Sequence, residues 1–176
     1  MIVTITSIFC TCNGQSKVAK QSVTNDAMAE YFGDTVASIF AAPTKVQAYI
    51  LSMDEPTEKS QTMGGFAIKK RLGNVKEAHY SILQFLMQDE SNYLSDSAEV
   101  RKCFFKPYLA FEFVKGKETV SVLIAFNCEC WGVVFNNKVI EKPYICQRQL
   151  LRFVYGFLPK DEYINELLKY QKEDTK

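Results

Sequence analysis

Several protein classes are excluded by what the sequence lacks. None of its apolar runs reaches the ~18 residues that a membrane-spanning helix needs. Its 21 basic and 20 acidic side chains nearly cancel, and the formal charge of +1 provides no basic surface for nucleic acid or an anionic membrane. We therefore expect no nucleic-acid partner, and contact with a membrane only through a lipid anchor.

Recognisable catalytic motifs are also missing. The sequence has no G-x-S-x-G elbow, no Walker loop, no G-x-G-x-x-G, no H-E-x-x-H and no EF-hand loop. It has one histidine, His79, so any Ser-His-Asp or Cys-His enzyme would have to use that residue. His79 falls on or beside the apolar stripe of a predicted helix, where a core-edge role with a bonded neighbour is the ordinary one. We expect no cofactor, no metal and no catalytic constellation.

What is present suffices for one domain with a sizeable core: 176 residues, 47% of them hydrophobic, with 13 Phe and 9 Tyr. Periodicity and capping signals predict helices on both sides of Gly33 and one over 75–89 that Asn74 caps. Strands are expected at 45–51, 66–72, 103–114, 120–135 and 138–145, and two further helices at 147–157 and 161–170. This order predicts an α+β fold: a single antiparallel sheet with a C-terminal three-stranded meander and helices packed on one face.

The N-terminus resembles an export signal. Residues 1–12 form a short apolar segment that ends in Cys10-Thr11-Cys12, which indicates a signal or lipoprotein segment with Cys12 or Cys10 as the lipidation candidate. No Lys or Arg precedes the apolar segment, which departs from the usual pattern. Residues 13–24 are polar and are expected to be a tether, and 25–176 the α+β domain. The alternative is a native first strand in a cytosolic protein.

Six cysteines are the most distinctive feature, and Cys128-Glu129-Cys130 lies inside an apolar run. If that run is one strand, both thiols face the core, because residues two apart share a face. A turn at Gly116-Lys117 then pairs Lys115 with Glu118 and, further along, places Cys103 opposite Cys130 within disulfide range. A turn at Asn136-Asn137 brings Cys146 close to Cys128.

Four interpretations of Cys103, Cys128, Cys130 and Cys146 remain open. One or two disulfides would form in an oxidising compartment, with Cys103–Cys130 as the leading pair. Alternatively, the thiols are plain buried side chains. Zinc binding is disfavoured because the spacing lacks C-x₂₋₄-C knuckles, and a redox centre is disfavoured because Glu129 has the wrong charge to lower a thiol pKa. Trp131 should lie on the face opposite the cysteines.

The central hairpin resembles a pattern in a diffuse set of uncharacterised exported bacterial proteins. In that pattern a Cys and a Pro open one strand and Phe-x-Cys closes the next, and here Cys103, Pro107, Phe126 and Cys128 match it. Cys130 is an addition to the pattern. The resemblance covers only this hairpin and implies no known activity, but it implies that Cys103 pairs with Cys128.

These observations predict a small exported or lipid-anchored domain of the cell envelope that binds an unidentified protein or small ligand. The alternative is a thiol- or His-dependent enzyme centred on His79 or a free cysteine. The second alternative is the cytosolic globular protein with a native first strand.

Overall fold

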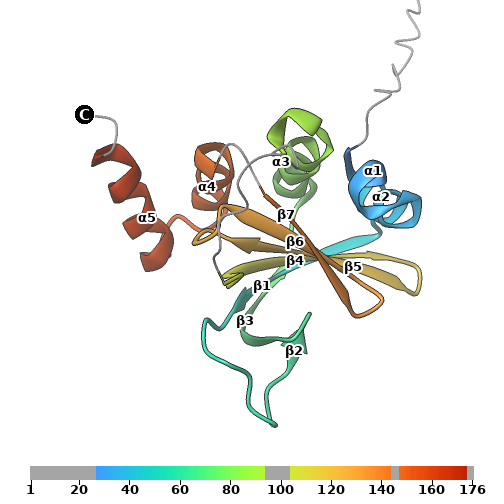
Figure 1. Cartoon of the computed structure of the whole chain (residues 1–176), viewed down its shortest axis with the longest axis horizontal. Coiled ribbons are helices and arrows are strands. Elements are labelled where there is room, and N and C mark those ends of the chain that lie inside the picture. The colour runs from blue at the N-terminus through green and yellow to red at the C-terminus, as the bar shows by residue number, and fades with distance from the viewer. Residues whose placement is uncertain (1–26, 94–103, 144–146, 174–176) are drawn as a thin grey trace, which may run out of the picture.

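The computed structural model describes residues 27–93, 104–143 and 147–173, and it contains a seven-stranded antiparallel sheet with helices on one face (Figure 1). The predicted α+β class is confirmed. The helices are α1 (Ala27–Phe32), α2 (Asp34–Ala41), α3 (Glu77–Gln88), α4 (Gln147–Phe157) and α5 (Glu162–Glu173), with a 3₁₀ turn at Glu90–Asn92. The strands are β1 (Lys45–Leu51), β2 (Thr62–Met63), β3 (Phe66–Asn74), β4 (Leu109–Lys115), β5 (Glu118–Ala125), β6 (Cys130–Phe135) and β7 (Lys138–Pro143).

The strand order is β2-β3-β1-β4-β5-β6-β7. The two predicted turns of the C-terminal part are confirmed: Lys115 pairs with Glu118, and Phe135 pairs with Lys138 across Asn136-Asn137. Both asparagines have positive φ (51° and 59°), the conformation that a two-residue hairpin turn requires and that Asn tolerates.

The expected strand 120–135 is two strands. The chain turns at 126–129, where Glu129 takes φ 50°, and β6 returns alongside β5 with Ala125 paired to Cys130. The meander therefore has four strands, β4 to β7, instead of three.

This turn changes which face each side chain occupies. Trp131 pairs with Ile124 and points to the helix-covered face, where it is fully buried against Tyr93 with ring centroids 5.0 Å apart. Trp131 does lie on the face opposite Cys130, as predicted. The prediction that the Cys130 thiol faces the core was wrong, because alternation was counted through 126–129 as if the strand were continuous.

The main core lies between the sheet and helices α1 to α4 (Figure 1). Alternate residues of β4 and β5 fill it, led by Phe111 and Phe113, which contact aromatic rings from the helices. Phe111 meets Phe153 and Phe157 of α4 with centroids 5.8 and 5.4 Å apart. Stacked sheet and helix layers of this kind bury one apolar face of each element.

The apolar stripe that the periodicity predicts for α3 is Val75, Ala78, Ile82 and Leu86, joined by Leu83 and Phe85, and only part of it faces the core. Leu83 and Leu86 are buried as expected, together with Met87, whereas Ile82 and Phe85 are 47% and 69% exposed. Asn74 does not cap α3 either. It belongs to β3, and Lys76 occupies the N-cap position without a side-chain hydrogen bond.

The opposite face of the sheet curls over on itself (Figure 1). A Cβ atom placed on Gly64, in the β2–β3 turn, would lie 2.7 Å from Val134 of β6 and 3.3 Å from Leu123 of β5. The edge hairpin therefore packs across the middle strands, and a small second cluster of Tyr49, Leu51, Met63, Ala110 and Leu123 forms beneath it. Phe105 closes this cluster by packing edge-on against Phe66, with centroids 5.7 Å apart.

The predicted signal segment 1–12 with Cys10 and Cys12, the tether 13–24, and two cysteines of the candidate set, Cys103 and Cys146, lie outside the described residues. Within the described ranges, no helix combines the length and the apolar character that crossing a membrane requires.

Candidate functional site

The two cysteines of Cys128-Glu129-Cys130 have different surroundings, because Cys128 lies in the β5–β6 turn and Cys130 begins β6. Cys130 is a free, buried thiol that donates a hydrogen bond to the Lys142 carbonyl at 3.1 Å. The expected Cys103–Cys130 disulfide is therefore not formed. That pairing required the strand to continue to residue 130, whereas the observed β4–β5 register ends at Leu109 and Ile124.

The Cys130 thiol is in an environment that lowers its reactivity. Burial, assisted by the negative charge of Glu141, raises its pKa from 9.0 to about 12, and the backbone of Lys142 only partly offsets this. A thiolate is the reactive form of cysteine, so this side chain is protonated at neutral pH and unsuited to nucleophilic or redox chemistry.

Cys128 faces the chain that enters β4. Its Sγ lies 3.0 Å from the carbonyl oxygen of Phe104, and the neighbouring Asn127 side chain donates to the same oxygen at 2.8 Å. Phe104 directly follows Cys103 in the sequence. The turn is therefore hydrogen-bonded to the residue after Cys103, which is the cysteine that the resemblance pairs with Cys128.

His79 lies on α3, with its ring edge-on to Phe157 of α4 at a centroid distance of 5.6 Å. Its Nδ1 is buried and has no hydrogen-bond partner among the described residues. Within the described part of the chain, Nδ1 therefore lacks the hydrogen-bonded neighbour that was expected. No serine or cysteine in these ranges is hydrogen-bonded to it either. The described ranges also contain no group of three or more His, Cys, Asp or Glu side chains able to hold a metal ion.

A large open cavity of about 820 Å³ lies where the end of β1 and the middle of β3 meet the start of α5, and we call it the lysine–tyrosine cleft. Its volume is in the range of small-molecule sites. The lining residues are Ile50, Leu51, Ser52, Met53, Asp54, Lys69, Lys70, Tyr108, Lys160, Asp161, Glu162 and Tyr163. Met53 leaves 39% of its surface exposed here and supplies apolar surface to the cleft.

An irregularity in the sheet brings two lysines to this cleft. The β1–β3 register pairs Ile50 with Lys70 but Leu51 with Ile68, so Lys69 is an extra residue on β3. A β-bulge of this kind changes the direction of side chains that would otherwise alternate between faces. Lys69 and Lys70 consequently both line the cleft, and Lys160 adds a third ammonium group.

A hydrogen-bonded aromatic wall forms the other side. The Tyr108 hydroxyl donates to Asp161 Oδ2 at 2.7 Å, and its ring lies 4.5 Å from that of Tyr163. Asp161 Oδ1 also accepts from the Ile164 backbone N–H at 3.1 Å, which caps α5. Both carboxylate oxygens are thus in use, and the wall is fixed before any ligand arrives.

The two tyrosines are hydrogen-bond donors rather than bases. Burial, followed by the hydrogen bond to Asp161 and its charge, raises the pKa of Tyr108 well above its usual range. Burial alone raises the pKa of Tyr163. Both hydroxyls therefore keep their protons throughout the physiological range.

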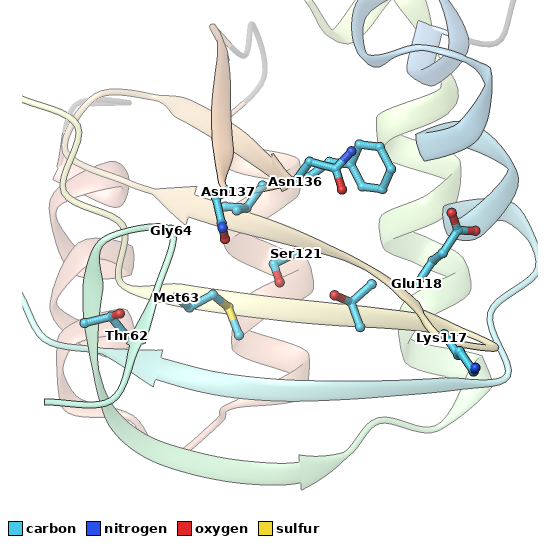
Figure 2. Close-up of a pocket in the computed structure, with 11 residues that line it drawn as sticks. Thr62, Met63, Gly64, Lys117, Glu118, Ser121, Asn136 and Asn137 are labelled. Atoms are coloured by element: carbon cyan, nitrogen blue, oxygen red, sulfur yellow. The ribbon is translucent and has the colours of Figure 1, made fainter.

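A second cavity of about 430 Å³ lies on the open face of the sheet, and we call it the hairpin pocket (Figure 2). Three turns converge on it, namely β2–β3, β4–β5 and β6–β7. The lining residues are Thr62, Met63, Gly64, Lys117, Glu118, Thr119, Ser121, Val134, Phe135, Asn136 and Asn137.

Neither cavity could be predicted from the sequence. The cleft joins residues 50–54 to residues 160–163, and the hairpin pocket joins residue 62 to residue 137, so both depend on long-range packing. The loop 52–64 was the one local signal, because long loops often carry function, and it contributes to both cavities.

Comparisons with known proteins return no relative for this chain. No family model matches it, and no curated protein or solved structure is significantly similar to it.

Proposed function

We propose that this chain is an exported or lipid-anchored binding domain of the cell envelope that holds a small amphiphilic anion in the lysine–tyrosine cleft. The carrying observation is the cleft itself. It combines an apolar patch, a fixed aromatic wall and three lysines in a space large enough for a ligand.

The lysines of the cleft are the groups that we expect to bind an anion. Three ammonium groups (Lys69, Lys70, Lys160) and three carboxylates (Asp54, Asp161, Glu162) line the space. Asp161 already accepts hydrogen bonds from Tyr108 and Ile164, and Asp54 accepts one from Ser52. Ammonium groups bind carboxylates, sulfonates and phosphates through charge-assisted hydrogen bonds. The apolar surface of Met53 and the tyrosine rings then suit an aromatic or aliphatic body.

The protonation of the wall supports binding rather than catalysis. A general base needs a pKa near the working pH, and the pKa values of Tyr108 and Tyr163 are moved away from it. Protonated hydroxyls in a fixed position orient a ligand by donating hydrogen bonds.

A matched pair of fluorescent probes tests this proposal. Anilinonaphthalene sulfonate has an aromatic body and one negative charge, and N-phenylnaphthylamine is its neutral counterpart. We expect the folded chain to bind the sulfonate more tightly, and Lys69→Gln/Lys70→Gln to weaken that binding about tenfold because two charge-assisted contacts are lost.

The control is Lys45→Gln/Lys138→Gln, which removes the same charge from two exposed lysines outside the cleft. Equal weakening by both double variants would attribute binding to net charge alone. Equal affinity for both probes in the unsubstituted chain would contradict an anion site.

The export part of the proposal is supported by the sequence of residues 1–12. Intact-mass spectrometry of the chain produced in a bacterium tests it. We expect cleavage before Cys12 or Cys10 with lipid attached, abolished by the corresponding Cys→Ser variant, and a Cys103–Cys128 disulfide with Cys130 free. An unprocessed chain with every thiol free would contradict both the anchor and the disulfide.

A further inference from the structure

We propose that the hairpin pocket is a second ligand site, independent of the cleft, and that it binds a neutral saccharide. Figure 2 shows Ser121 near the middle of the pocket, with Thr62 and Met63 on one side and Lys117 and Glu118 on the other. Asn137 projects from the β6–β7 turn toward the same space.

The pocket is lined chiefly by uncharged polar groups. Three hydroxyl side chains (Thr62, Thr119, Ser121) and two amide side chains (Asn136, Asn137) surround the space. Hydroxyls and amides each donate and accept hydrogen bonds, which matches the hydroxyl groups of a sugar ring. The two charges, Lys117 and Glu118, are adjacent, exposed and opposite in sign, so the pocket has no net preference for an ion.

Ser121 gives the strongest local indication. Its side chain is only 7% exposed, and within the described part of the chain its hydroxyl has no hydrogen-bond partner. The hydroxyl oxygen itself stays accessible and is not among the buried unpartnered atoms of the described residues. A hydroxyl that opens into a pocket from an otherwise buried residue can donate to a ligand and accept from it. The apolar surfaces of Met63 and Val134, which belong to the open-face cluster, can cover the C–H face of a sugar ring.

An extended peptide fits this location less well. Peptides commonly bind sheets by adding a strand to an exposed edge. Strands β5 and β6 are interior strands whose backbone groups already pair on both sides, so the pocket offers recognition through side chains alone.

The backbone conformation of two turns fixes the walls of the pocket. Gly64 rests on Val134 and Leu123 with no room for a side chain, and Asn136 and Asn137 fix the opposite turn through positive φ values. The walls are therefore preorganised, which reduces the entropy lost on binding.

The test uses nuclear magnetic resonance of the ¹⁵N-labelled full chain. The probes are glucose, galactose, mannose, N-acetylglucosamine, maltose, cellobiose and lactose, each titrated to the limit that its solubility allows. We expect at least one to shift the amide resonances of Thr119, Ser121 and Asn137, while the cleft resonances of Lys69 and Tyr163 stay in place.

Two variants probe the contacts without disturbing the fold. Asn137→Gly removes the amide while retaining the positive φ, and Ser121→Ala removes the hydroxyl. Each should weaken the responding sugar about tenfold through the loss of one or two hydrogen bonds. Ser81→Ala, on the exposed side of α3, is the matched control and should leave the affinity unchanged.

The proposal is overturned if no sugar shifts the pocket resonances, or if the three variants bind equally. It is also overturned if glucuronate or an extended peptide shifts these resonances while every neutral sugar fails. Because this test follows the amide resonances of the hairpin pocket, its outcome does not depend on whether the lysine–tyrosine cleft binds an anion.

Discussion

The two faces of the sheet are built on different principles. The helix-covered face is closed by fully buried aromatic and aliphatic side chains, with Phe111, Phe113 and Trp131 at its centre. Within the described residues, the other face is covered by the β2–β3 turn and Phe105, and it combines a small apolar cluster with the hairpin pocket. The first face stabilises the fold, and the second leaves room for a ligand.

The largest difference should appear when one aromatic ring is removed from each face. Phe111→Ala leaves a cavity among Phe153 and Phe157 and should cost about 3–5 kcal/mol of the free energy of unfolding. Phe105 is only partly buried, so Phe105→Ala should cost clearly less. Urea unfolding of both variants measures the difference, and equal losses would show that the open face is as important to stability as the core.

The next prediction concerns how tightly the hairpin lies on the open face. Gly64 and Gly65 both have positive φ (58° and 87°), so Ala at either position is strained by roughly 1–2 kcal/mol. At Gly64 the new Cβ also meets Val134 at 2.7 Å, whereas nothing lies within 4 Å of it at Gly65. Gly64→Ala should therefore be the more destabilising by about 1–3 kcal/mol, the usual cost of overpacking.

Gly65→Ala is the matched control for backbone strain in that experiment. If thermal unfolding gives the same loss for both variants, the turn does not rest on β5 and β6, and the hairpin pocket loses one of its walls.

The strands that end at local turn signals could be predicted from the sequence. β1 was predicted with its observed bounds, and the turns at Gly116-Lys117 and Asn136-Asn137 gave the observed registers. Each of these depends on neighbouring residues only. Glycine and asparagine adopt the left-handed conformation at low cost, so their positions mark turns directly.

The β5–β6 turn had a weaker signal. Residues 126–129 contain one asparagine, Asn127, but neither glycine nor proline, and the positive φ falls on Glu129, a residue type that seldom adopts it. The apolar run continues through the turn, so the alternation of side chains alone predicts one long strand. Missing this turn placed the Cys130 thiol on the core face and produced the incorrect Cys103–Cys130 pair.

The candidate sites depend on information that no local pattern contains. The bulge that brings Lys69 beside Lys70 exists only in the pairing of β3 with β1, and the Tyr108–Asp161 bond joins residues 53 positions apart. Long-range packing of this kind places residues that appear unrelated in the sequence into one cavity.

A smaller effect is expected from the titration of the Cys130 thiol on the open face. The pKa of Cys130 is raised from 9.0 to about 12, so the unfolded chain loses this proton first as the pH rises. The stabilising contribution is therefore complete below pH 9.0 and is lost as the pH rises toward 12. Cys130→Ser keeps a donor for the Lys142 carbonyl and does not titrate, so its stability should fall less steeply above pH 9, by up to about 1 kcal/mol per pH unit.

Thermal unfolding from about pH 7 to about pH 10 measures this slope for both chains. Burial also raises the pKa of Tyr163, which acts in the same direction, but that contribution is present in both chains and cancels in the comparison. Identical slopes would place the Cys130 thiol in contact with water.

The smallest expected effect tests the outer side of the closed face. The periodicity of α3 predicted Phe85 in the core, but its side chain is 69% exposed, whereas Leu83 is fully buried. Phe85→Gln should change the free energy of unfolding by no more than about 0.5 kcal/mol, because surface substitutions seldom do more. Leu83→Ala on the same helix should cost about 2–5 kcal/mol. A large loss from Phe85→Gln would mean that Phe85 packs into the core beside Leu83, as the periodicity predicted.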